Sequence, residues 1–165
     1  MERIIELLKT VNRPGVDNVV KYIQESDFAT ARCGKHHTYA GGLVDHELEV
    51  YEFMKQKYSD SLPEESIIVC ALLHDLDKAK LSGWSFRGHH PSRVIPILKR
   101  CGFTLTEEEA FAIRNHHRTS GDVLSHSYRR ALTDADMYST GEWRKVHCKL
   151  TSKDLLLEVF RKIFL

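Results

Sequence analysis

An apolar helix that ends in two ionisable residues constrains this chain more than any other feature of its sequence. Pro63 suits the first turn of a helix, and residues 67–73 (IIVCALL) are apolar on every face, which predicts a helix through the core. His74 and Asp75 follow directly. A buried ionised carboxylate is costly unless a positive group meets it. Two solutions are open: a metal ion, or an ion pair of Asp75 with Lys78 while His74 bonds a carbonyl.

Helical spacing of apolar residues continues through most of the chain. Amphipathic helices are expected near 4–11, 16–26, 43–58, 91–101, 106–117 and 128–138, and from Ser152 onward. Thr106 and Glu109 form a capping box, whereas Pro96 is expected to kink its helix. No segment alternates with period two over a useful length. The sequence therefore predicts an all-α, single-domain helical bundle over residues 1–165.

Charge and cysteine content bear on the class of protein. Lys and Arg total 24 against 23 Asp and Glu, so the chain lacks the overall basic charge of bulk nucleic-acid or membrane binders. The four cysteines are far apart and form no CxxC pair, which favours neither a disulfide framework nor a cysteine zinc site. The N-terminal stretch is charged, and the longest apolar run is too short for a bilayer. We expect a cytoplasmic protein with no membrane partner.

Histidine is the unusual residue of this chain. Most of the ten histidines fall in the segments GKHHTYAGG, VDHE, LLHD, RGHHPS, RNHHRTS and LSHSY. His46, His74, His116 and Asp136 belong to different predicted helices. Any one of them is explained equally well by a structural role, but together they form a mixed imidazole and carboxylate set. Such a set suits Mn, Fe, Co, Ni or Zn, and with bound water Mg, and bundle cores commonly house sites of this kind.

The order of these residues resembles a known family. His46, His74-Asp75, His90, His116 and Asp136 follow the H…HD…H…H…D signature of the HD-domain metal-dependent phosphohydrolases, over about residues 28–140. The segment HHTYAGGLVDHELEV resembles the first-ligand helix of the YhaM-like branch, and ALLHDLDK resembles the family form LLHDIGK. AIRNHH and ADMYST match the later blocks of the family. The family fold is all-helical, in agreement with the periodicity.

The resemblance implies a ligand set for one or two divalent ions. It implies that one ion is bound by His46, His74, Asp75 and Asp136, and a second by His90 and His116. Two blocks carry doubled histidines. His90 is preferred over His89 because the residues after it follow the spacing of the family's next helix, and His116 is preferred over His117.

Further residues receive roles from the resemblance or from their position beside the histidine clusters. Asp75, bridging two ions, would position the nucleophile, and Lys78 stands where the family has its HDxxK lysine, near a phosphate oxygen. Both are assigned to catalysis. Substrate binding is assigned to His37, Lys78, His89, Arg93 and His117, with Arg87 and Arg118 as further phosphate contacts, and His126 and His147 are expected to be solvated.

The expected function is hydrolysis of a nucleotide or related small phosphorylated substrate by a metal-activated water. No Walker loop, GxSxG elbow or HExxH stretch supports another hydrolase mechanism. The first alternative is a phosphodiesterase or 3′-to-5′ ribonuclease. The near-zero net charge gives little electrostatic attraction for a nucleic-acid polymer. A non-catalytic metal- or nucleotide-binding regulator and a di-iron oxygenase are the others. Trp84 and Phe86 are candidates for stacking on a base or for packing.

Overall fold

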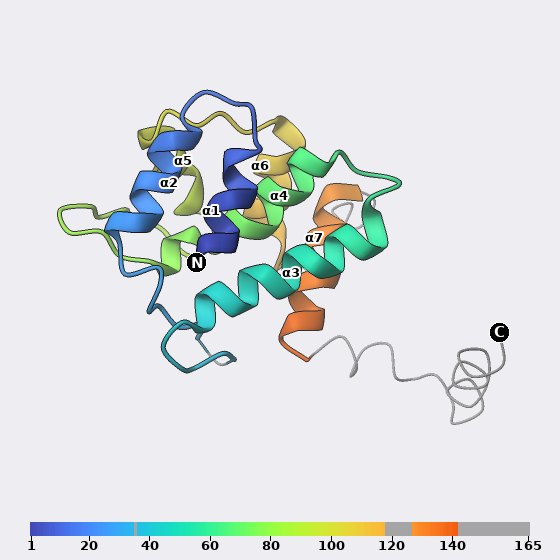
Figure 1. The fold of residues 1–165 in the computed structure, drawn as a ribbon, viewed down its shortest axis with the longest axis horizontal. Helices are drawn as coiled ribbons and strands as arrows, with labels where there is room; N and C mark the ends of the chain where they lie inside the picture. The colour runs from blue at the N-terminus through green and yellow to red at the C-terminus, as the bar shows by residue number, and fades with distance from the viewer. Residues whose placement is uncertain (35, 118–126, 142–165) are drawn as a thin grey trace, which may run out of the picture.

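The computed structural model describes residues 1–34, 36–117 and 127–141 (Figure 1). In chain order its helices are α1 (Glu2–Lys9), α2 (Val16–Glu25), α3 (Gly42–Tyr58), α4 (Glu64–Leu73), the short 3₁₀ helix η1 (Leu76–Lys78), α5 (Val94–Arg100), α6 (Glu107–Asn115) and α7 (Ser127–Ser139). The described residues form helices and loops and no strand. The predicted all-α bundle is confirmed for this part of the chain. The helix expected from Ser152 onward lies outside the described residues.

Helix α4 is the central element of the bundle. All of its residues from Ser66 to Leu73 are buried, as the uninterrupted apolar run predicted. It packs against α1, α3 and α6, and α7 packs on both α3 and α6 (Figure 1). Its C-terminal end is enclosed as a result, since His74 and Asp75 are only 0% and 1% exposed.

Local sequence explains the boundaries of the later helices. The predicted capping box is present: Thr106 Oγ1 accepts from the Glu109 N–H at 3.2 Å, and Glu109 Oε2 accepts from the Thr106 N–H at 2.9 Å. Helix α5 begins at Val94, later than expected, so Pro96 lies in its first turn. A missing N–H there costs no helical hydrogen bond, and the expected cause of a kink is therefore removed.

Glycine is required at the start of α3. A Cβ atom at Gly42 would overlap the carbonyl oxygen of His37. The loop that carries His36 and His37 can therefore approach the first turn of α3 only because residue 42 has no side chain. This approach places the two imidazole rings 4.9 and 5.6 Å from the ring of His46, measured between centroids.

Cys33, Cys70 and Cys101 are buried free thiols, and Cys148 lies outside the described residues. None of the helices within the described ranges combines the length and the apolar character that crossing a membrane requires.

Candidate metal centre

The residues expected to bind metal converge at one end of the bundle. They are His46 on α3, His74 and Asp75 directly after α4, His90 in the loop before α5, His116 directly after α6, and Asp136 on α7. His74 and His116 are the residues at which α4 and α6 end. Because these helices pack against one another, their ends bring side chains far apart in the sequence to one place.

His46, His74, Asp136 and the Oδ2 atom of Asp75 form what we call the buried group. Nε2 of His46 lies 3.2 Å from Nε2 of His74, 3.3 Å from Oδ1 of Asp136 and 3.5 Å from Oδ2 of Asp75. Nε2 of His74 lies 3.7 Å from the same Oδ2. Ligands about 2.1 Å from one ion are roughly 3 to 3.4 Å apart at octahedral or tetrahedral angles. The buried group therefore fits a single metal ion after small adjustments.

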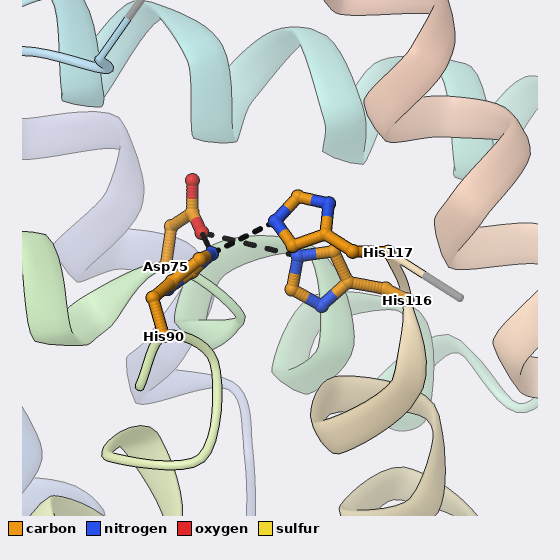
Figure 2. A group of neighbouring side chains, drawn as sticks. All are labelled: Asp75, His90, His116 and His117. Carbon is orange, nitrogen blue, oxygen red and sulfur yellow. Dashed lines mark hydrogen bonds and ion pairs between the residues drawn. The ribbon is translucent and has the colours of Figure 1, made fainter. Parts of the chain in front are cut away.

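His90, His116, His117 and the Oδ1 atom of Asp75 form the outer group (Figure 2). Nε2 of His90 lies 2.9 Å from Oδ1 of Asp75 and 3.0 Å from Nε2 of His117. Nε2 of His116 is farther from that oxygen, at 4.0 Å. The side chain of His117 is 50% exposed, so the outer group opens to solvent whereas the buried group does not.

Asp75 and His116 each bring a buried polar atom to the outer group. Among the described residues, Oδ1 of Asp75 and Nε2 of His116 are buried atoms that make no hydrogen bond of acceptable geometry. An unsatisfied buried polar atom costs about 1–3 kcal/mol. Two such atoms directed into one cluster of imidazoles fit a divalent ion, which would bind both.

The hydrogen bonds of the imidazoles favour the same conclusion. In each of four histidines Nδ1 contacts an acceptor: Ser139 Oγ for His46, the Ala71 carbonyl and Glu47 for His74, Asp77 for His90, and the Ile113 carbonyl for His116. An N–H at Nδ1 leaves the lone pair on Nε2, which is the nitrogen that faces the two groups. Second partners of this kind fix the tautomer and the orientation of metal-binding histidines.

Protonation in the two groups is set by burial and by opposite charges. Burial, followed by the nearby His74, lowers the pKa of His116 to about 3. Burial alone would raise the pKa of Asp75 and Asp136, but His74 in the first case and His46 in the second hold both well below the usual range. The neutral imidazole of His116 and the ionised carboxylates are in the forms that bind metal, whereas the raised pKa values of His74 and His90 mean that each must release a proton when an ion binds.

Glu47 is a buried carboxylate that the sequence analysis did not identify. Its Oε2 atom lies 2.9 Å from Nδ1 of His74, and its side chain is fully buried. Burial disfavours the charged form of His74, but Glu47 outweighs it and helps raise the pKa of His74 to about 10. Glu47 lies four residues from both Leu43 and Tyr51, on the apolar stripe of α3. This position on the apolar stripe is the feature of the sequence that indicates burial of Glu47.

Asp77, also missed, supports His90 from the opposite side. Oδ1 of Asp77 lies 2.7 Å from Nδ1 of His90. Oδ2 accepts a hydrogen bond from Nε of Arg93 at 2.9 Å and forms an ion pair with Nη2 of Arg93 at 2.9 Å. The carboxylate is 1% exposed. Arg93, which was assigned to substrate, contacts Asp77, two residues after the HD pair. These contacts direct Nε2 of His90 toward Asp75.

Lys78 and His37 lie next to the buried group. Lys78 forms a very short ion pair with Oδ2 of Asp75, which is one of the two solutions left open for this carboxylate, and the same oxygen also faces His46 in the buried group. His37 contacts Glu49 at 3.3 Å, and Glu49 accepts a 2.6 Å hydrogen bond from Ser139. Because Ser139 contacts His46, His37 belongs to a chain of contacts behind that ligand.

The doubled histidines are placed differently at the two positions. His90 belongs to the outer group, whereas His89 is exposed and lies in none of the His/Cys/Asp/Glu groups found among the described residues. His116 and His117 both belong to the outer group. Arg87 is exposed. Arg118, His126 and His147 lie outside the described residues.

Comparisons of the chain with protein-family models, with curated proteins and with solved structures found no significant match. The structure itself establishes an all-helical fold whose clustered imidazoles and carboxylates can hold metal ions. The resemblance to HD-domain proteins rests on the ordered residues and on this geometry, which is compatible with a site of that kind.

Proposed function

We propose that this chain is an HD-type metal-dependent phosphohydrolase acting on a nucleotide or related small phosphorylated substrate. The observation that carries the proposal is the position of Asp75, whose two oxygens face the buried group and the outer group. A carboxylate so placed suits two divalent ions held side by side. Bound ions of this kind polarise phosphoryl oxygens and supply a water nucleophile at neutral pH.

Lys78 contributes a positive charge at the same place. Burial opposes its charged form, but the adjacent Asp75 carboxylate outweighs burial and raises the pKa of Lys78. The ammonium group therefore stays charged at neutral pH. With 20% of its side chain exposed, it can meet a phosphoryl oxygen and offset the charge that develops there during hydrolysis.

A nucleoside is assigned to the hollow beside the outer group. This hollow, about 290 Å³ in volume, is lined in part by Asp77, Trp84, Phe86 and Arg93. Asp77 joins it to the outer group because the same carboxylate contacts His90. The rings of Trp84 and Phe86 lie 5.8 Å apart, and aromatic rings of this kind can stack on a base. Substrate would then reach the outer group from its exposed side.

The test is phosphate release by metal-stripped protein resupplied with Mn, Fe, Co, Ni, Zn or Mg. The substrates are nucleoside mono-, di- and triphosphates, cyclic nucleotides and short RNA. We expect metal-dependent turnover of a small nucleotide. Asp75→Asn should abolish it, whereas Asp60→Asn, a matched change at an exposed position, should leave it unchanged.

Other outcomes would redirect the assignment. Shortening of RNA without turnover of small nucleotides would indicate the nuclease alternative. Firm metal binding with no turnover of any substrate would indicate a regulator. Product formation only with iron and oxygen would indicate an oxygenase, and each of these results would contradict the proposal.

A further inference from the structure

A third group of ligand atoms lies beside the buried group. Cys33, His36 and His46 each offer one ligand atom, and these atoms lie within 4.8 Å of one another. We call them the Cys–His group. The wide spacing of the cysteines, with no CxxC pair, favoured no cysteine zinc site, and Cys33 and His36 lie in a loop segment without helical periodicity. Only the approach of that loop to α3 brings them to His46.

The backbone of this loop holds the Cys–His group in place. The N–H of His36 donates to the carbonyl of Cys33 at 3.0 Å, and the N–H of Cys33 donates to the carbonyl of His37 at 3.2 Å. Cys33 is fully buried, and the rings of His36 and His46 lie 4.9 Å apart. The thiol and both imidazoles are therefore positioned by the fold.

The donor types of the Cys–His group differ from those of the other two groups. A thiolate with two imidazoles favours Zn²⁺ and similar thiophilic ions, whereas Mn²⁺ and Mg²⁺ prefer oxygen ligands. Burial keeps a thiol protonated in the absence of an ion, but coordination deprotonates it outright. The Cys–His group thus offers a chemically distinct choice of metal.

His46 belongs to both the Cys–His group and the buried group. Its Nδ1 is engaged by Ser139 at 2.9 Å, and Ser139 in turn donates to Glu49. This arrangement leaves Nε2 as the ligand nitrogen. One nitrogen has a single lone pair, so it serves one ion at a time.

We propose that Cys33, His36 and His46 form a separate site for a thiophilic divalent cation, and that an ion there competes with the buried group for His46. The site is independent of the proposed hydrolysis, because it requires only metal binding. A thiophilic ion would withdraw His46 from the buried group, which makes the occupation of the two sites mutually exclusive.

The first experiment is a Co²⁺ titration of the full chain, followed by the near-ultraviolet sulfur-to-cobalt charge-transfer band. The wild type should develop the band. Cys33→Ser should lose it, and His36→Ala should shift its midpoint to at least about tenfold higher Co²⁺, as expected for loss of a ligand. Cys101→Ser and Cys148→Ser are the matched controls and should keep the band. Circular dichroism checks that each variant is folded.

A second titration tests the shared ligand. Saturating Mn²⁺ should move the midpoint of the wild-type band to higher Co²⁺ by at least about tenfold, because Mn²⁺ in the buried group holds His46. In Asp136→Asn, which weakens the buried group and removes no ligand of the Cys–His group, the shift should shrink. A band that is absent from the wild type or survives Cys33→Ser would overturn the site. A midpoint unmoved by Mn²⁺ would overturn the competition. Neither result depends on turnover, so failure here is distinguishable from failure of the proposed function.

Discussion

The two ends of helix α4 both bury charge, but they do so in opposite ways. At the N-terminal end Arg13 makes two hydrogen bonds to Glu109, at 2.6 and 2.9 Å, and one to Glu65 at 2.9 Å. Ser66 also donates to Glu109, at 2.7 Å. At the C-terminal end Asp75 faces several imidazoles, yet its Oδ1 atom makes no hydrogen bond of acceptable geometry within the described residues.

This difference separates a structural charge from a candidate functional one. Arg13, Ser66 and the Thr106 N–H donate hydrogen bonds to the Glu109 carboxylate, so this cluster needs no ligand and stabilises the fold. The cluster around Asp75 differs, because Nε2 of His116 also makes no hydrogen bond of acceptable geometry to the part of the chain that the structure describes. Burial alone does not identify a site. Buried atoms that converge on one place and make no hydrogen bond of acceptable geometry point to one, since such atoms are rare in folded proteins.

Arg13→Ala should cause the largest change and should affect stability alone. It leaves the fully buried Glu109 without its cation, and breaking a buried pair in this way costs about 3–5 kcal/mol. Urea unfolding of the metal-free protein measures the loss. Arg3→Ala is the control, because Arg3 pairs with Glu6 at the surface and should change stability by about 0.5 kcal/mol or less. A similar loss of unfolding free energy in both variants would contradict the view that Arg13 stabilises the fold by pairing with the buried Glu109.

Asp75→Asn should instead remove the stabilisation that metal provides. An ion that binds only the folded protein adds about 2.7 kcal/mol at one hundred times its dissociation constant. We expect this gain with Mn²⁺ in the wild type and in Arg13→Ala, but not in Asp75→Asn. Unfolding with and without Mn²⁺ measures it. An equal gain in all three proteins would contradict the assignment of Asp75 as a ligand.

Asp77→Asn should weaken the outer group and leave the buried group unaffected. The carboxylate orients His90 without facing the ion, and loss of such a partner lowers metal affinity about 10- to 100-fold, or about 1.4–2.7 kcal/mol. Calorimetric titration with Mn²⁺ should show one weakened equivalent and one unchanged. Asp60→Asn should give the wild-type isotherm. Loss of both equivalents would show that the two groups are not separable.

The smallest effect is expected in the pH dependence of stability that arises from Glu109, at the N-terminal end of α4. Burial would raise the pKa of Glu109, but Arg13 outweighs it and holds this pKa below the ordinary value of 4.5. Its contribution to stability is therefore complete above pH 4.5 and is lost as the pH falls through the lowered folded pKa.

Glu109→Gln tests this linkage because the amide cannot ionise. The stability difference between wild type and variant should shrink below pH 4.5, by at most about 1.4 kcal/mol per pH unit for one proton. Chemical unfolding at a series of pH values measures it. A constant difference would show that Glu109 is not held ionised by its partners.

Residue order and periodicity predicted much of the fold and of the candidate site. The apolar run before His74 predicted a buried central helix, and the spacing around His46, His116 and Asp136 placed these residues on separate helices. Those signals are local, because a helix is defined by residues three and four positions apart. The capping box at Thr106 was readable for the same reason.

The supporting residues were not readable in this way. The position of Glu47 on the apolar stripe of α3 indicates burial, but nothing local shows that its carboxylate, or that of Asp77, contacts an imidazole. Arg93 was assigned to substrate because it follows a histidine cluster in the sequence, and only the structure shows that it pairs with Asp77. These assignments depend on which side chain faces which after packing.

The sequence by itself determined an all-helical chain with imidazoles and carboxylates at the ends and on the inner faces of its helices. The tertiary structure alone decided that Asp75 divides its two oxygens between two groups, and that Cys33 meets His46. The physical reason is that helix formation depends on neighbours along the chain, whereas the contacts of a ligand atom depend on how helices pack and how closely a loop can approach them. The contact made possible by Gly42 is an example of the second kind.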